Sequence, residues 1–198
     1  FGSSAKACAG QIRIKHINFG GYSVSNSANT NAFLDFANCS NTEVSDCFFA
    51  QHGGSVISVG REKSGAAANI TIRNNLISWS RGVHPAIVLQ TPEGANAIWG
   101  ASINANYFLT DRNDAPCIEI AGGNVRGVNI LDNIFNKYGY YQGTGIVVRS
   151  GYSHNVSGNQ FISFSTGSSP ISFQPVESND FRSTVANNSF GYSTPTNG

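Results

Sequence analysis

The stretch ILDNIF at residues 130–135 decides the fold, because its pattern recurs along the chain at a nearly constant interval. The pattern is an aliphatic residue, two variable positions, a small or polar residue, one further variable position, and then Phe or Ile. The interval between copies is 26 to 31 residues, and the seven copies begin at Ile14, Val44, Ile72, Ile103, Ile130, Val156 and Val185. A repeat of this length is typical of proteins in which each copy is one structural unit stacked on its neighbours.

A second hydrophobic segment follows each of the first six copies. These segments begin at Phe33, Val56, Ala86, Cys117, Gly145 and Pro170. Their alternating apolar members, such as Ile118 and Ile120, give a period of two, which predicts a strand with one buried face. Turn-rich links separate the copies, and neither segment has helical spacing over a useful length.

Two or three short strands per repeat exclude most repeat architectures. A propeller blade needs roughly 40 residues or more, and the LxxLxL signature of leucine-rich repeats is absent. The sequence therefore predicts an all-β parallel β-helix, a solenoid of about seven coils with 26 to 31 residues per coil. Stacking at about 4.8 Å per coil would give a rod of roughly 34 Å.

Two columns of equivalent positions support this stacking. The fourth position of the repeat is Asn in the last five copies, at Asn75, Asn106, Asn133, Asn159 and Asn188. Amides at one position of successive coils are expected to hydrogen-bond to each other as an internal Asn ladder. The sixth position is mostly Phe and is expected to stack inside the rod, at Phe19, Phe49, Phe108, Phe135, Phe161 and Phe190.

Length and composition limit the class of protein. We expect residues 1–198 to form a single β-helix domain, and, because the chain has no Met and starts abruptly, to be a piece of a longer protein. The net charge is only +1 and 12% of residues are charged, which argues against nucleic acid as a partner. No apolar run approaches the roughly 20 residues that span a membrane, so no membrane partner is expected. A neutral surface rich in Asn, Ser and aromatic residues suits neutral polyols such as glycans.

The sequence contains no pattern that indicates a cofactor or a metal, and we expect neither. The four cysteines, Cys8, Cys39, Cys47 and Cys117, have no CxxC spacing and no His pair at metal-ligand offsets. Free structural thiols and a disulfide are the two interpretations. Clustered carboxylates of the kind that bind calcium are also not visible.

With its VxxNxF copies and its Asn column, the chain resembles the right-handed parallel β-helix (pectate-lyase-like) superfamily of pectate lyases, polygalacturonases and bacteriophage tailspikes. The resemblance runs from about Ile12 to Phe190 and is greatest to the central domain of tailspike polysaccharide depolymerases. It implies a right-handed coil, a homotrimer, and a place in the virion tail or outside cells. The implied partner is a bacterial surface polysaccharide, namely capsule, exopolysaccharide or lipopolysaccharide O-chain. No catalytic motif carries over: residues 13–15 match the RIK string of polygalacturonases, but the accompanying Asp motifs are missing.

The link between the two main strands gathers residues suited to sugars in the third to fifth coils. Hydrolysis of a glycosidic bond needs two carboxyl groups, and the candidate catalytic acids are Asp111, Asp114 and Glu119. Aromatic rings cover apolar sugar faces, and Arg binds the carboxylates of acidic sugars. The candidate substrate-binding residues are Trp79, Arg81, His84, Arg112, Tyr138, Tyr140, Tyr141 and Arg149.

Several of these candidates also have a purely structural interpretation. Asp111 and Asp114 are typical turn residues, and Glu119 could form a surface ion pair with Arg149 of the next coil. His84 could be an ordinary loop residue, and the three tyrosines could pack against a neighbouring subunit. A second surface lacks paired acids and ranks lower; it consists of Arg61, Glu62, Lys63, Glu93, Arg126, Tyr152 and His154.

Three functions remain open from the sequence. In the leading hypothesis the protein binds and cleaves a bacterial surface polysaccharide, as a glycoside hydrolase or as a lyase. A lyase would use His84 or Tyr138 as the base and Arg81 or Arg112 to hold a uronate. The alternatives are a non-catalytic glycan-binding receptor module and a structural β-helix shaft. Release of reducing ends separates the first from the second, and glycan retention separates the second from the third.

Overall fold

The computed structural model describes ten stretches of the chain. All regular structure in these stretches is β-strand, and none of their segments forms a helix that could cross a membrane. The described residues are 11–20, 32–50, 54–60, 67–78, 84–91, 97–110, 115–137, 143–165, 168–174 and 182–193.

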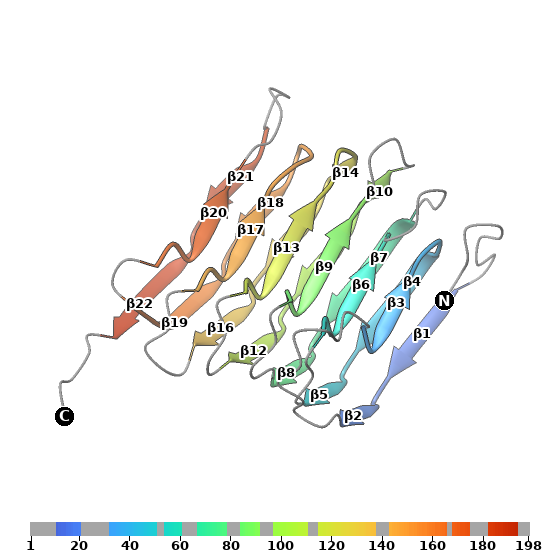
Figure 1. The fold of residues 1–198 in the computed structure, drawn as a ribbon, viewed down its shortest axis with the longest axis horizontal. Coiled ribbons are helices and arrows are strands. Elements are labelled where there is room, and N and C mark those ends of the chain that lie inside the picture. The colour runs from blue at the N-terminus through green and yellow to red at the C-terminus, as the bar shows by residue number, and fades with distance from the viewer. Residues whose placement is uncertain are drawn as a thin grey trace.

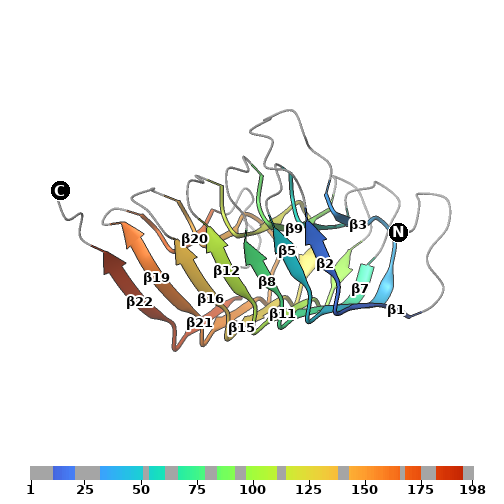
Figure 2. The ribbon, with the colours of Figure 1, turned by 90° about the horizontal axis from the view of Figure 1, so that it is seen from below.

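Three parallel sheets run along the molecule, and the chain visits them in turn (Figures 1 and 2). The first sheet has the order β1 (Ile12–Lys15), β4 (Ser40–Ser45), β7 (Ala67–Arg73), β11 (Ser102–Asn104), β15 (Asn129–Leu131), β18 (Asn155–Ser157) and β21 (Thr184–Ala186). The second sheet has the order β2 (Asn18–Gly20), β5 (Phe48–Ala50), β8 (Leu76–Ser78), β12 (Tyr107–Thr110), β16 (Ile134–Lys137), β19 (Gln160–Ser165) and β22 (Ser189–Ser193). The third sheet has the order β20 (Ile171–Phe173), β17 (Ile146–Val148), β13 (Ile118–Ala121), β9 (Ile87–Gln90), β6 (Ile57–Val59) and β3 (Leu34–Phe36).

Two further short strands extend the first sheet in the fourth and fifth coils. They are β10 (Ile98–Trp99) and β14 (Val125–Arg126). Strand β10 pairs in parallel with β14 on one side and with the beginning of β7 on the other.

Successive members of each sheet come from successive copies of the repeat, which confirms the predicted parallel β-solenoid. The number of coils differs from the predicted seven. The third sheet contains six strands, so within the described residues the last copy of the repeat contributes only β21 and β22. The described chain therefore has fewer complete three-strand turns than copies of the repeat.

The repeated apolar positions form the core because they fall in register on the inner faces of the sheets. The aliphatic residues that begin the copies are paired from coil to coil in the first sheet, from Ile14 to Val185. In the second sheet, ring centroids are 4.7 to 4.9 Å apart in the pairs Phe19–Phe49, Phe108–Phe135 and Phe135–Phe161. Ile77 occupies the same position in the third coil, where it lies between Phe49 and Phe108 and divides the stack in two.

Every coil turns from the first to the second sheet at one residue with left-handed backbone. The φ angles are 52° to 69°, at His16, Asp46, Asn74, Ala105, Asp132, Gly158 and Asn187. Gly, Asn and Asp adopt this conformation at lower cost than other residues. The bend is therefore specified by residue type in most coils, with Ala105 and His16 as the departures.

The residue after the bend is the Asn of the repeat, and its side chain is directed into the corner. Asn75 donates from Nδ2 to Oδ1 of Asn106 at 2.9 Å, and the same bond joins Asn106 to Asn133, Asn133 to Asn159, and Asn159 to Asn188 at 3.0 Å. Each Oδ1 also accepts the backbone N–H of the preceding Asn in this series. The turn is thus held by hydrogen bonds between coils as well as within them.

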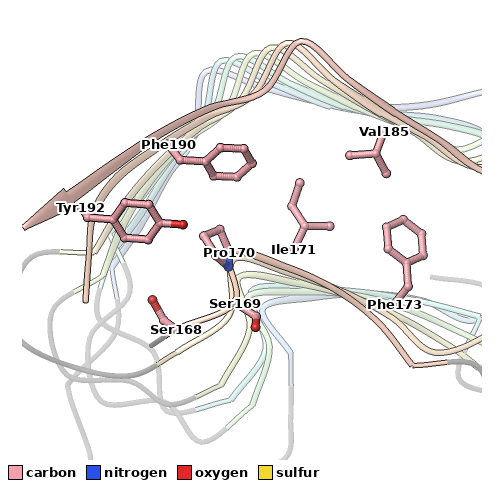
Figure 3. Close-up of a pocket in the computed structure, with 8 residues that line it drawn as sticks. All are labelled: Ser168, Ser169, Pro170, Ile171, Phe173, Val185, Phe190 and Tyr192. Carbon is pink, nitrogen blue, oxygen red and sulfur yellow. The ribbon is translucent and has the colours of Figure 1, made fainter. Parts of the chain in front are cut away.

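The apolar core is open at the C-terminal end of the described coils. Phe190 stacks on Phe161 at 5.3 Å, yet it is 47% exposed, because no described coil follows it. A cavity of about 450 Å³ lies there (Figure 3), lined by Ser168, Ser169, Pro170, Ile171, Phe173, Val185, Phe190 and Tyr192. Most of these residues belong to the inner columns, so this cavity is the end of the core.

The cysteines that the structure describes are free thiols. Cys39, Cys47 and Cys117 are buried. Burial raises the pKa of the Cys117 thiol to about 11, which keeps it protonated and unreactive at neutral pH. Cys8 lies outside the described residues.

Candidate functional site

Most residues of the predicted sugar site lie outside the part of the chain that the structure describes. They are Asp111, Asp114, Trp79, Arg81, Arg112, Tyr138, Tyr140 and Tyr141. Their roles therefore stay predictions. The structure places the other three residues, Glu119, His84 and Arg149.

Glu119 and Arg149 form an ion pair on the outer side of the third sheet. Arg149 donates from Nε to Oε1 of Glu119 and from Nη1 to Oε1 of Gln174, which lies one coil further on. The structural interpretation of Glu119 as an ion-pair partner is therefore correct. Its carboxylate accepts a charge-assisted hydrogen bond from Arg149, which is also one of the predicted substrate-binding residues.

His84 comes three residues before β9 and is partly buried. Its Nε2 atom is shielded from solvent and has no hydrogen-bond partner among the described residues. Among the described residues, no hydrogen bond or ion pair joins His84 to Glu119 or Arg149. The three described members of the predicted site thus do not form one constellation by themselves.

A different group of side chains converges on the outer face of the first sheet. Trp99 pairs with Arg126 in register across β10 and β14, and Arg126 forms a parallel bridge with Tyr152. In a β-strand, residues at the same register position point to the same side of the sheet. Three successive coils therefore present Trp, Arg and Tyr in one row.

The Arg126 guanidinium is held between the two aromatic rings. Its Cζ atom is 4.9 Å from the ring centroid of Trp99 and 4.7 Å from that of Tyr152. These distances match the spacing of about 4.8 Å between neighbouring strands, so stacking requires no distortion of the coil. Cation–π attraction favours a guanidinium over an aromatic face. We refer to Trp99, Arg126 and Tyr152 as the aromatic stack.

The backbone next to the aromatic stack is fixed by a second column of left-handed residues. Gly100 and Gly127 have φ angles of 65° and 62°, and Ser153 has 61°. The N–H of Gly100 donates to the carbonyl of Arg126, and that of Gly127 to the carbonyl of Tyr152, both at 3.1 Å. The strand direction changes directly after each member of the stack, while the stacked residues stay in register.

His154 anchors the segment that carries Tyr152. Its Nδ1 accepts the backbone N–H of Val128 at 3.3 Å, and its Nε2 lies 3.1 Å from the carbonyl oxygen of Ser150. The side chain is buried, and burial lowers the pKa of His154. The prediction that His154 belongs to an exposed surface is therefore wrong, because its side chain is buried and hydrogen-bonded to backbone groups.

The exposed part of the stack offers an apolar face beside hydrogen-bond donors. Trp99 is 52% exposed, and Arg126 and Tyr152 are partly exposed. The Nε atom of Arg126 is shielded and has no hydrogen-bond partner among the described residues. An indole face can cover the apolar side of a sugar ring, while a guanidinium donates to hydroxyl or carboxylate oxygens.

A row of small polar side chains runs beside the aromatic stack on the same sheet. Ser102, Asn129 and Asn155 are paired in register and partly exposed. Asn104 donates to Oγ of Ser102 at 2.6 Å, which fixes both side chains. Hydroxyl and amide groups of this kind can exchange hydrogen bonds with a polyol.

The sequence carries a signal for the aromatic stack. The lower-ranked surface predicted above includes Arg126 and Tyr152 but omits Trp99. The three residues are separated by steps of 27 and 26 residues, which are the steps between Ile103, Ile130 and Val156. Each of the three residues stands four positions before the aliphatic residue that begins its copy of the repeat, and this constant offset is the signal of the row. Arg61, Glu62, Lys63 and Glu93 of that surface lie outside the described residues.

Comparison of the chain with protein-family models, with curated proteins and with solved structures gave no match.

Proposed function

We propose that the protein is a glycan-binding β-helix that recognises a bacterial surface polysaccharide through the outer face of its first sheet. The observation that carries this proposal is the aromatic stack, in which Arg126 is fixed between Trp99 and Tyr152 beside a row of polar side chains. The proposed architecture is a right-handed, tailspike-like coil with an internal asparagine ladder, in a virion tail or another extracellular assembly.

Three features support a sugar as the ligand. The exposed Trp99 ring provides the apolar surface that sugar rings stack on. The stack holds the Arg126 guanidinium in one orientation before ligand arrives, so less side-chain entropy is lost on binding. The formal net charge of +1 gives no broad positive field of the kind that nucleic acids require.

Cleavage of the polysaccharide is a separate proposal that rests on the carboxylates of the predicted sugar site. Two acids are needed, and Asp111, Asp114 and Glu119 are the candidates. A depolymerase would release reducing ends, and the triple variant Asp111→Asn, Asp114→Asn, Glu119→Gln would lose at least about 100-fold in turnover while retaining the polysaccharide. Retention without chain shortening in the unmodified protein would instead identify a receptor module.

The binding proposal is tested with a panel of bacterial capsules, exopolysaccharides and lipopolysaccharides in affinity electrophoresis. We expect retention on at least one of them, and a loss of affinity of about tenfold or more in Trp99→Ala, since an exposed aromatic anchor of this kind dominates a small interface. Leu76→Ala is the matched control, because Leu76 is 42% exposed but lies on the second sheet. Equal retention of Trp99→Ala and the parent protein would refute the proposed site.

A further inference from the structure

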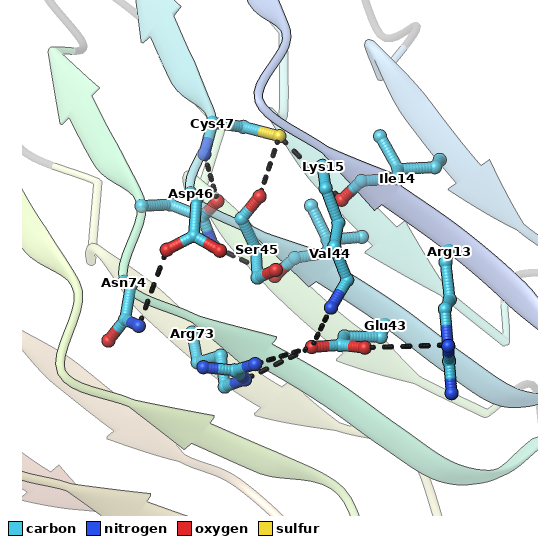
Figure 4. A network of polar contacts seen from close by, with 11 residues as sticks. Arg13, Ile14, Lys15, Glu43, Val44, Ser45, Asp46, Cys47, Arg73 and Asn74 are labelled. Atoms are coloured by element: carbon cyan, nitrogen blue, oxygen red, sulfur yellow. Dashed lines mark hydrogen bonds and ion pairs between the residues drawn. The ribbon is translucent and has the colours of Figure 1, made fainter.

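The first sheet carries a second group of interacting side chains at its N-terminal end (Figure 4). Arg13 and Lys15 come from β1, Glu43 from β4, and Arg73 from β7. All lie on the outer side of the first sheet, in the part of the strands that follows the left-handed column next to the aromatic stack. Oε1 of Glu43 is 2.9 Å from Nζ of Lys15 and 2.8 Å from Nη2 of Arg73. We refer to these four residues as the Glu43 cluster.

The Glu43 cluster contains more positive than negative charge. Three cations surround the carboxylate of Glu43. A second carboxylate, that of Asp46, lies at the neighbouring bend and accepts a hydrogen bond from Asn74 at 3.4 Å. With Asp46 included, the group still carries one excess positive charge. The hydrogen bond from Lys15 lowers the pKa of Glu43, so this carboxylate is ionised at neutral pH. The count of charges therefore holds under physiological conditions.

The arginine side chains of the cluster are more exposed to solvent than the carboxylate of Glu43. The Glu43 side chain is 17% exposed, whereas that of Arg13 is 59% exposed and that of Arg73 is 41% exposed. The carboxylate lies beneath the cations and holds them together, while the guanidinium groups reach solvent. An anion that approaches this face meets the arginines before it meets Glu43.

Both arginines retain donors for a ligand. Arg73 uses Nε and Nη2 on Glu43, at 3.1 and 2.8 Å, which leaves Nη1. The nearest approach of Arg13 to Glu43 is 3.8 Å, which is longer than a hydrogen bond, so Glu43 uses none of its N–H groups. Guanidinium donors in a fixed fork match the two oxygens of a carboxylate.

A polar cavity of about 350 Å³ adjoins the cluster. It is lined by Gln11, Asn41, Thr42, Glu43, Asn69, Thr71 and Arg73. Asn69 donates to Oδ1 of Asn41 at 3.1 Å, which orders two of these amides. The lining combines hydroxyl and amide groups with Arg73 and with the carboxylate of Glu43, whose charge is offset by the three cations around it. Hydroxyl, amide and guanidinium groups can bind the hydroxyl and carboxylate oxygens of a uronic acid.

We propose that the Glu43 cluster binds the carboxylate of an acidic sugar, so that the polysaccharide recognised by this face is anionic. This inference rests on the proposed glycan-binding function and names its substrate class. Strand β4, which carries Glu43, lies three strand steps from β15 in the first sheet. Arg126 lies next to β15, so the Glu43 cluster and the aromatic stack are separated by about 14 Å along the rod. A polysaccharide laid across the strands would contact the cluster and the aromatic stack with different sugar units.

The experiment uses sodium glucuronate as the probe and glucose as its neutral counterpart, with sodium chloride at matched ionic strength. The Nε–Hε resonances of the arginines are followed by NMR during each titration. We expect glucuronate, but not glucose, to shift the resonances of Arg13 and Arg73. Arg149 is the matched control, because it is paired with a glutamate in the same way on the third sheet.

The variant Arg13→Gln, at an exposed position where folding is not at risk, should weaken glucuronate binding by about tenfold. Trp99→Ala should remove polysaccharide retention but leave the response to glucuronate unchanged. Failure of the proposed function would therefore appear in the retention experiment, and failure of this inference in the glucuronate titration. Equal shifts with glucose, shifts confined to Arg149, or an unchanged affinity in Arg13→Gln would overturn the inference.

Discussion

At the scale of single residues, the left-handed bend between the first and second sheets is the most demanding position of each coil. Asn, Asp or Gly occupies it in five of the seven described bends, but Ala105 holds the conformation with φ of 52°. A residue with a Cβ atom pays about 1 to 2 kcal/mol there, whereas glycine does not. Part of this difference is cancelled, because glycine gains freedom in the unfolded chain.

We therefore expect Ala105→Gly to raise the free energy of unfolding by up to about 1 kcal/mol, measured by urea denaturation. Ala101→Gly is the control, because Ala101 is buried and lacks a positive φ angle, and it should be destabilised. A loss of stability in Ala105→Gly would show that the methyl group contributes more than the strained backbone costs.

His154 should make stability depend on pH. Because burial lowers its pKa, the neutral ring stabilises the fold fully above the ordinary histidine pKa of 6.5, and this contribution is lost as the pH falls through the lower pKa of the folded state. Protonation would also end the acceptance of the Val128 N–H by Nδ1. Unfolding measured between about pH 7 and pH 5 should show falling stability, and His154→Gln should flatten this slope. An identical slope in both proteins would exclude His154 as the cause of the pH dependence. Glu43 does not contribute to this slope, because its pKa is lowered and its effect on stability is confined to pH values below its ordinary pKa of 4.5.

At the scale of the element, the asparagines that join the coils act as one hydrogen-bonded series. Asn133 is fully buried; its Oδ1 accepts from Asn106, and its Nδ2 donates to the carbonyl of Ile103 and to Asn159. Asn133→Leu would leave these neighbours without partners, at a cost of about 1 to 3 kcal/mol. Asn188→Leu at the partly exposed end of the series should cost less, because water can replace the lost bonds. Equal stability losses at both positions would argue against a buried series as the source of the effect.

Strand positions could be predicted from the sequence because burial constrains them. Inner residues such as Ile103, Ile130 and Val156 must be apolar in every coil, so the repeat is visible in the chain and gives the register. Outer residues have no such constraint. The row of Trp99, Arg126 and Tyr152 shares only a spacing and no residue type, so no recurring residue marks it in the sequence. Links between strands differ in length from coil to coil, so their residues cannot be aligned by offset alone.

At the scale of the whole molecule, we predict a homotrimer. We propose this assembly from the sequence resemblance to tailspikes alone, and because a rod of stacked coils buries little apolar surface beyond its own core. Light scattering should give about three times the 21.0 kDa of the chain. A mass of one chain at micromolar concentration would contradict this prediction.

Two candidate places for a polysaccharide remain. The aromatic stack lies on the first sheet. Trp79 of the predicted sugar site follows β8 in the sequence and is outside the described residues. The two proposals each depend on one tryptophan, and the chain has only two. Removing either indole therefore distinguishes the two faces.

The most direct test is the dissociation constant of the retained polysaccharide for the parent protein, for Trp99→Ala and for Trp79→Ala, measured by isothermal titration calorimetry. Recognition by the first sheet predicts that Trp99→Ala weakens binding by about tenfold or more, while Trp79→Ala stays within about twofold of the parent. The opposite result, with binding lost in Trp79→Ala and kept in Trp99→Ala, would contradict recognition by the first sheet and assign binding to the predicted sugar site.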